Sequence, residues 1–246
     1  MDPDVLQKIR LINTEFYQTF ADSFASTRGR LQPGVQRLVP TILDCERVLD
    51  LGCGNGELAS ALAEHGFRGH YLGIDLSAAM LAIARENVKS DDRFAFISAE
   101  LGADQLAARI LENTGQRFHP PYDHQVAFAS LHHIPGRDAR EGLVRELHDL
   151  AKPGARLSLS VWNFMDSERL RARVLPWETV GLSSGQVEEG DYLIDWRRDG
   201  EGIRYVHHFS AAELSELGEQ AGYRVQETFY SDGETGALGL YQIWEA

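Results

Sequence analysis

The chain has 246 residues, of which 43% are hydrophobic and 25% are charged, as is usual for one globular α/β domain with an elaboration. Its net charge of −13 argues against passive adhesion to nucleic acid or to an anionic membrane. Two cysteines cannot build a disulfide framework, the acidic start has no signal-peptide core, and no apolar run approaches the roughly 20 residues that cross a bilayer. We therefore expect a cytoplasmic protein with no membrane partner.

Residues 1–44 precede the first predicted strand. Val5, Ile9, Phe16 and Phe20 recur at helical spacing, which predicts an amphipathic helix. A second helix is expected over residues 37–43. Because aromatic stripes of this kind belong more often to a core than to a cofactor site, this segment is interpreted as a helical lead-in.

A glycine loop follows a short apolar run at residues 47–51. Glycines at 52, 54 and 56 allow positive φ and let a ligand approach the backbone. A helix over residues 58–65 should point its free N–H groups at the same place. A second strand, residues 70–75, ends in Asp75, which can accept hydrogen bonds from both hydroxyls of a ribose. The pattern predicts a nucleotide-binding crevice at the carboxyl edge of a parallel sheet.

The spacing of the loop favours a cationic ligand. It reads G-x-G-x-G rather than the dinucleotide fingerprint G-x-G-x-x-G, it contains no basic residue, and Asp50 stands two residues before the first glycine. An anionic pyrophosphate would gain nothing from Asp50. The loop resembles that of class I methyltransferases, which bind S-adenosylmethionine with its positive sulfonium and ammonium groups. A nicotinamide oxidoreductase is the alternative from another enzyme class.

Strands and helices alternate from residue 70 to residue 162. Helices are predicted at 78–86, capped by Ser77, at 101–113 and at 140–150. Strands are predicted at 94–98, 123–130 and 157–162, with a turn at 152–154. This alternation indicates right-handed crossovers and a doubly wound, mostly parallel sheet of the Rossmann-like class.

The resemblance to class I methyltransferases also implies a set of cofactor-binding residues. Leu76 follows the second strand, Glu100 follows the third where the adenine ring is usually met, and Ser130 ends the fourth strand under the sulfonium. In many such enzymes the lead-in folds over the cofactor, so Tyr17 and Arg28 would line the site. Arg28 would hold the methionine carboxylate; the alternative is an arginine on a solvated helix end.

Catalytic residues are harder to find than cofactor residues. Methyl transfer from a sulfonium is an in-line displacement in which the protein mainly positions the acceptor. A base is needed only if the acceptor carries a proton. His132 and His133 follow the fourth strand, where they could orient or deprotonate the acceptor or serve the architecture. His pairs without cysteines or convergent acids do not indicate a metal site.

After residue 163 the pattern predicts strands at 192–196, 203–209, 223–230 and 239–244. A helix at 211–221 should begin with a capping box between Ser210 and Glu213. The chain is thus divided into a lead-in (1–44), a cofactor-binding core (45–162), and a substrate-side elaboration with closing strands (163–246).

Several of these elements resemble one subgroup, the tRNA wobble-uridine carboxymethyl methyltransferases. The matching stretches are residues 24–28, 131–133, 161–162, 191–196 and 204–209. The resemblance implies a carboxylate acceptor held by Arg204 and His207. Asp195 replaces the family's proline, and the acidic chain is unlike a tRNA binder. A small-molecule or nucleoside acceptor, intact tRNA, and a non-catalytic cofactor-binding partner subunit therefore all stay open.

Overall fold

The computed structural model describes residues 1–20, 31–89, 91–103, 105–197 and 200–246. Arg28 and the 24–28 stretch lie outside the described residues. The central sheet has the order β3-β2-β1-β4-β5-β10-β9 among the described residues. Neighbours from β3 to β5 are parallel, whereas β10 is antiparallel to β5 and β9. The strands are β1 (Arg47–Leu51), β2 (His70–Asp75), β3 (Phe94–Ser98), β4 (Tyr122–Phe128), β5 (Ala151–Trp162), β9 (Arg224–Ser231) and β10 (Gly239–Glu245).

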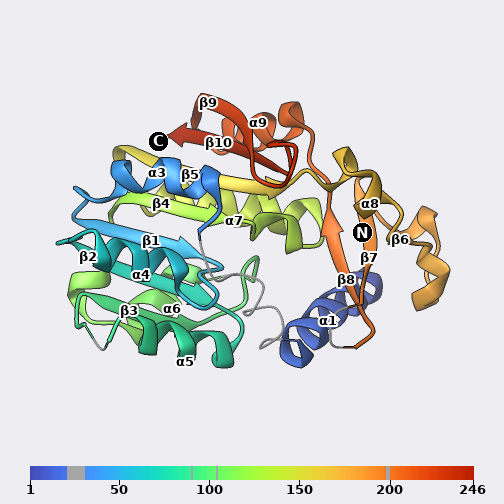
Figure 1. The fold of residues 1–246 in the computed structure, drawn as a ribbon, viewed down its shortest axis with the longest axis horizontal. Coiled ribbons are helices and arrows are strands. Elements are labelled where there is room, and N and C mark those ends of the chain that lie inside the picture. The colour runs from blue at the N-terminus through green and yellow to red at the C-terminus, as the bar shows by residue number, and fades with distance from the viewer. Residues whose placement is uncertain (21–30, 90, 104, 198–199) are drawn as a thin grey trace.

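Helices cover both faces of this sheet (Figure 1). On one face α3 (Pro33–Ile42), α4 (Glu57–Glu64) and α5 (Ala78–Asn87) bury their apolar sides against the strands. On the other face α6 (Leu106–Asn113), α7 (Arg137–Asp149) and α9 (Ala211–Gln220) do the same. Because both faces are covered, the central strands are continuously buried, as in β2, where the four middle residues are fully inside. The predicted doubly wound, mostly parallel sheet is confirmed.

A smaller lobe stands at the side of the central sheet (Figure 1). In the described residues it contains an antiparallel sheet of β6 (Val174–Leu175), β7 (Asp191–Trp196) and β8 (Gly202–His207), with the short helix α8 (Glu168–Arg171) nearby. The lead-in helix α1 (Pro3–Thr19) packs on this sheet, with Val5 and Ile9 against Leu193 and Tyr205. Helix α1 and β8 are therefore placed together, beside the carboxyl edge of the central strands.

Local differences from the predicted elements have local causes. Helix α6 begins at Leu106 rather than 101, because Gly102 and Gln105 both have left-handed φ (79° and 74°). The predicted turn at 152–154 lies inside β5, where Gly154 has φ 75° and the pairing with β4 shifts register. Only half of the predicted capping box forms at α9 within the described contacts: Ser210 accepts from the backbone of Glu213, whose carboxylate is bound by His207 instead.

The three predicted regions interleave in space. Strands β9 and β10, from the third region, complete the central sheet, and α3, from the lead-in, packs on it beside α4. Helix α1, by contrast, packs on the lobe. Among the described residues, no helix is both long enough and apolar enough to cross a bilayer.

Candidate cofactor and acceptor site

The three loop glycines all have left-handed φ, but they face different surroundings. A Cβ on Gly52 would lie 2.5 Å from Cβ of Ser130, and one on Gly56 would lie 2.8 Å from Cβ of Ala84. A Cβ on Gly54, at φ 55°, would meet nothing within 4 Å. Gly52 and Gly56 are therefore required by packing against β4 and α5, whereas Gly54 borders open space into which a ligand can reach.

Asp75 ends β2 directly across from this loop. Its carboxylate accepts from the backbone N–H of Gly54 (2.9 Å) and from that of Ser77 (2.9 Å). These two bonds fix the carboxylate at the carboxyl end of β2, beside the loop that follows β1. The strand order of the sheet reverses between β1 and β4, and α/β sheets bind nucleotides at such a switch point.

A pocket lies where the loop, Asp75 and the end of β4 meet helix α1. It is lined by Arg10, Asn13, Thr14, Tyr17, Gly52, Gly54, Asp75, Leu76, Ser77, Met80, Glu100, Leu101, Ala129, Ser130, His133, Ile134 and Pro135. The structure thus brings together eight residues predicted for the site from distant parts of the chain, namely Tyr17, Gly52, Gly54, Asp75, Leu76, Glu100, Ser130 and His133. Asp50, Gly56, His132, Arg204 and His207 do not line this pocket.

Asp50 lies behind the glycine loop rather than on the pocket wall. Its side chain is buried and accepts a hydrogen bond from the hydroxyl of Tyr71. Burial raises the pKa of Asp50 to about 7, the Tyr71 bond opposes that rise, and the neighbouring Asp75 adds to it. Asp50 can therefore act on a cationic ligand only through its field, and only when it is ionised.

This leads to a pH-dependent prediction. A positive cofactor favours ionised Asp50, so the affinity for S-adenosylmethionine should rise between about pH 6 and pH 7.5 as Asp50 loses its proton. Calorimetry on the protein and on Asp50→Asn, at matched pH, cancels the cofactor's own titration. The ratio of the two affinities should grow across that range; a constant ratio would show that Asp50 does not act on the ligand.

Three hydrogen-bonding residues, Asn13, Tyr17 and Tyr205, hold His133 just after the end of β4. It belongs to the turn Leu131–His133, which follows the strand. Its Nδ1 lies 3.2 Å from the carbonyl oxygen of Tyr205, and its Nε2 lies 2.7 Å from the hydroxyl of Tyr17. Asn13 donates to the backbone carbonyl of His133 (3.0 Å) and accepts from the backbone N–H of Tyr205 (2.8 Å). Helix α1, β4 and β8 are joined at this point.

Asn13 is a site residue that sequence reasoning missed. It is 7% exposed, and it lies one helical turn from Ile9 and one from Tyr17, on the buried face of α1. A polar side chain on an otherwise apolar stripe is the signal that could have found it, because a buried amide must find hydrogen-bond partners.

His132 lies behind His133. It is buried, its ring centroid is 4.1 Å from that of His133, and its Nδ1 lies 3.4 Å from the backbone nitrogen of Trp162. This geometry favours the architectural role for His132 over direct contact with an acceptor.

Arg204 lies in an aromatic cage between the lobe and the central sheet. Its guanidinium carbon is 4.5 Å from the ring centroid of Trp162 and 5.6 Å from those of Phe16 and Trp196. Cation–π contacts of this kind hold the guanidinium in place. Arg204 is buried and does not line the pocket. Its predicted contact with the acceptor therefore stays a prediction.

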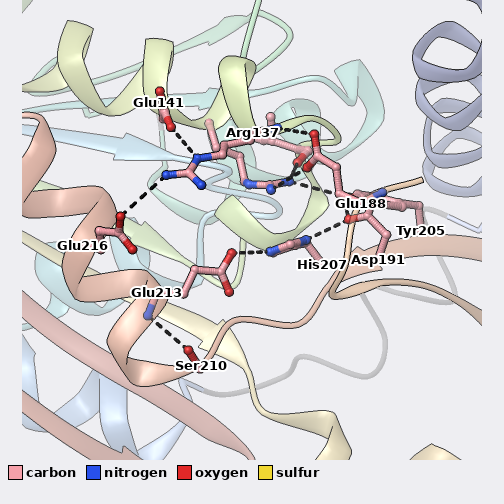
Figure 2. Close-up of polar contacts among 11 residues, drawn as sticks. Arg137, Glu141, Glu188, Asp191, Tyr205, His207, Ser210, Glu213 and Glu216 are labelled. Carbon is pink, nitrogen blue, oxygen red and sulfur yellow. Dashed lines mark hydrogen bonds and ion pairs between the residues drawn. The ribbon is translucent and has the colours of Figure 1, made fainter. Parts of the chain in front are cut away.

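His207 is part of a buried ionic network instead of the pocket (Figure 2). Its Nδ1 lies 2.7 Å from Asp191 and its Nε2 lies 2.8 Å from Glu213. Burial lowers the pKa of His207, but the bonds to the two carboxylates outweigh it and raise the pKa above its usual value. With both ring nitrogens engaged, His207 joins β7, β8 and α9 and does not offer a group to an acceptor.

The network continues to the central domain. The Tyr205 hydroxyl donates to Asp191 (2.7 Å), while Arg140 on α7 donates to Glu188 (2.9 Å) and to the carbonyl of Ile134 (3.1 Å). It therefore fixes β8, which carries the Tyr205 carbonyl, relative to the turn that carries His133.

Comparison with known proteins agrees with this geometry. A family model described as "Methyltransferase domain" matches residues 23–228. The chain belongs to this methyltransferase domain family. The structure is similar to that of a SAM-dependent methyltransferase from Methanosarcina mazei, with a TM-score of 0.63, 23% identity, and 88% of this chain and 98% of that chain covered. It is also similar to SAM-bound CalS10, an amino pentose methyltransferase from Micromonospora echinaspora. The TM-score is 0.60 and the identity 18%, with 93% of this chain and 96% of that chain covered.

Curated relatives of this methyltransferase-family chain differ in how much of it they match. A ubiquinone biosynthesis O-methyltransferase of Pseudomonas aeruginosa is 33% identical over 48% of the chain and 45% of the relative, so the chain spans about half the length of that relative. A putative methyltransferase of Encephalitozoon cuniculi is 26% identical over 85% of the chain and 86% of its own length. A tRNA (carboxymethyluridine(34)-5-O)-methyltransferase of Arabidopsis thaliana is 26% identical over 59% of the chain and 31% of its own length.

The methyltransferase pocket fits S-adenosylmethionine in its chemistry. Gly54 leaves room beside the backbone, the Asp75 carboxylate has the chemistry to accept from ribose hydroxyls, and the Ser130 hydroxyl is buried without a hydrogen-bond partner among the described residues. The enclosed volume, about 150 Å³, is below the roughly 300–1,000 Å³ of typical ligand pockets.

Asp75 provides the simplest test of where the ribose of the cofactor lies. Asp75→Ala should weaken S-adenosylmethionine binding by at least ~1 kcal/mol, because it removes the ribose acceptor and also the bonds that hold Gly54 and Ser77. Calorimetry measures the change. Unchanged affinity would contradict the assigned place of the ribose.

Proposed function

We propose that this protein transfers the methyl group of S-adenosylmethionine to a small-molecule or nucleoside acceptor, and that it does so in the cytoplasm. The observation that carries the proposal is that Gly54, Asp75, Ser130 and His133 line one pocket together. When bound, the cofactor supplies an activated methyl group. The chain supplies orientation, a wall of α1 that excludes water, and a histidine at the acceptor end. The cytoplasmic location is supported by the free thiols of Cys45 and Cys53.

Intact tRNA is the alternative acceptor, supported by the Arabidopsis relative. The charges argue against it. The net charge is −13. Two arginines of the third region, Arg173 and Arg197, are bound by one carboxylate: Asp195 accepts from Arg173 (2.6 Å) and from Arg197. The charges of these two arginines are balanced by Asp195. Binding to tRNA needs cations that are available to neutralise phosphates and thereby release the counterions condensed on the nucleic acid.

The test uses tritiated S-adenosylmethionine with two acceptor sources, unfractionated tRNA and a deproteinised metabolite extract. We expect S-adenosylmethionine to bind, NADH not to bind, and label to enter the small-molecule fraction only. Label in tRNA, together with binding that falls steeply with added salt, would favour the alternative. NADH binding would indicate an oxidoreductase, and cofactor binding without transfer to either source would indicate a non-catalytic subunit.

A further inference from the structure

Tyr17 and His133 form a hydrogen-bonded pair in the wall of the pocket, although 116 positions separate them in the chain. Resting on the proposed function, we propose that this pair accepts a proton from the methyl acceptor, and that the acceptor is accordingly a group that still carries a proton on its nucleophilic atom, such as a phenol, an alcohol or a ring N–H, rather than a carboxylate. Tyr17, counted so far as a cofactor contact, then becomes a catalytic residue.

The contacts of His133 determine which of its nitrogens can take a proton. A backbone carbonyl can only accept a hydrogen bond, so the 3.2 Å contact with Tyr205 places the ring proton on Nδ1. In the neutral ring Nε2 is then an acceptor, and the Tyr17 hydroxyl donates to it. The pair therefore presents a phenol whose proton already points at a basic nitrogen.

This arrangement is held by groups outside the pair. Asn13 lies one helical turn before Tyr17 and bonds both the carbonyl of His133 and the N–H of Tyr205. The helix that brings Tyr17 to Nε2 thus also fixes the backbone on both sides of the ring. Within the described contacts, the other histidines near this edge have different partners: His132 contacts the Trp162 backbone, and His207 is bound by two carboxylates.

The proposed step balances without a further reactant. The acceptor gives its proton to the Tyr17 oxygen while the Tyr17 proton moves to Nε2 of His133. The acceptor atom forms the bond to the methyl carbon, and the sulfur keeps the electron pair of the broken S–C bond. His133 ends as an imidazolium, whose Nδ1–H donates to the carbonyl oxygen of Tyr205 and whose Nε2–H donates to the hydroxyl oxygen of Tyr17, and it later releases one proton to solvent. A carboxylate acceptor is already ionised, so it would have no proton for this pair to accept.

Nitrogen-15 spectroscopy of the histidine rings tests the pair directly. The protein is labelled at its histidines, saturated with S-adenosylhomocysteine, and titrated between about pH 5 and pH 9, with His133→Gln identifying the signal. We expect His133 to carry its proton on Nδ1 when neutral and to gain the second proton on Nε2. Tyr17→Phe should shift the Nε2 resonance and its titration. A neutral ring protonated on Nε2, or a Tyr17→Phe spectrum identical to the wild type, would overturn the inference.

Thr41→Val is the matched control. Thr41 also carries a hydroxyl that donates to a carbonyl of its own helix, that of Leu38 (2.7 Å), but it does not line the pocket. It should leave the His133 titration unchanged.

Transfer from tritiated cofactor to the metabolite extract then decides the acceptor class. We expect product label that resists mild alkali. The transfer rate should fall by about 10²–10⁴-fold in Tyr17→Phe but not in Thr41→Val, with S-adenosylhomocysteine affinity kept within about twofold. Label released by alkali as methanol identifies an ester, and would overturn the inference while leaving the methyltransferase intact. No label at all, with cofactor bound, would contradict the proposed function and this inference together.

Discussion

Gly54→Val should abolish measurable binding of S-adenosylmethionine, a loss of at least about a hundredfold, while the protein still folds. A side chain at this position meets nothing within 4 Å, so it does not clash with the protein but fills the space beside the backbone that the ligand needs. The residue adopts φ 55°, and a β-branched side chain there costs roughly 1–2 kcal/mol of stability by itself.

The matched control for this change is Gly66→Val. Gly66 follows α4 at φ 81°, a side chain at this position would also meet nothing within 4 Å, and the residue does not line the pocket. The two variants should lose similar stability by thermal unfolding, yet only Gly54→Val should lose the cofactor in calorimetry. Normal binding by Gly54→Val would show that the cofactor lies elsewhere.

Asp191→Ala should lower the free energy of unfolding by about 3–5 kcal/mol, because it removes one partner of a buried ionic network. The Asp191 side chain is fully buried and accepts from Tyr205, His207 and the backbone of Glu188. All three donors would lose their acceptor at once. Chemical denaturation measures the change.

Glu216→Ala is the control in the same region. Its carboxylate lies 3.7 Å from Arg137, but both side chains are 61% exposed. An exposed pair of this kind contributes about 0–1 kcal/mol. A loss in Asp191→Ala no larger than in Glu216→Ala would contradict the role of the network as the joint between β8 and α9.

The same network predicts how stability changes with pH. The pKa of His207 is raised in the folded protein, so its contribution is fully present below its unfolded pKa of about 6.5 and is lost as pH rises through the folded pKa. The free energy of unfolding should therefore fall as pH increases above about 6.5, and His207→Gln should flatten that part of the curve. An unchanged slope in the variant would mean that His207 is not charged in the fold.

Much of the fold follows from periodicity, because the central strands are buried on both faces and leave uninterrupted apolar runs. Strands β2 and β3 begin and end where the sequence predicts. The predictions are wrong where backbone conformation decides: Gln105 is left-handed without being glycine, and Gly154 forms a bulge within a strand instead of a turn between elements.

The site was partly predictable for a related reason. The glycine loop and Asp75 lie within a short stretch of chain, so their spacing carries the information. The partners of His133 described above come from two remote elements, α1 and β8, and no spacing in the sequence relates Asn13 or Tyr17 to His133. For His207 the sequence suggested a contact that the structure does not favour. The resemblance at residues 204–209 implied contact with the acceptor, whereas Asp191 and Glu213 bind both of its ring nitrogens.

The most direct measurement is a crystal structure of the protein with S-adenosylhomocysteine. We predict the ribose hydroxyls on the Asp75 carboxylate, the ligand backbone beside Gly54, and the sulfur facing Ser130 and the Tyr17–His133 pair. Electron density for the ligand in another cleft, such as the depression between Met1 and Glu188, with the space beside Gly54 closed by side chains, would contradict the account.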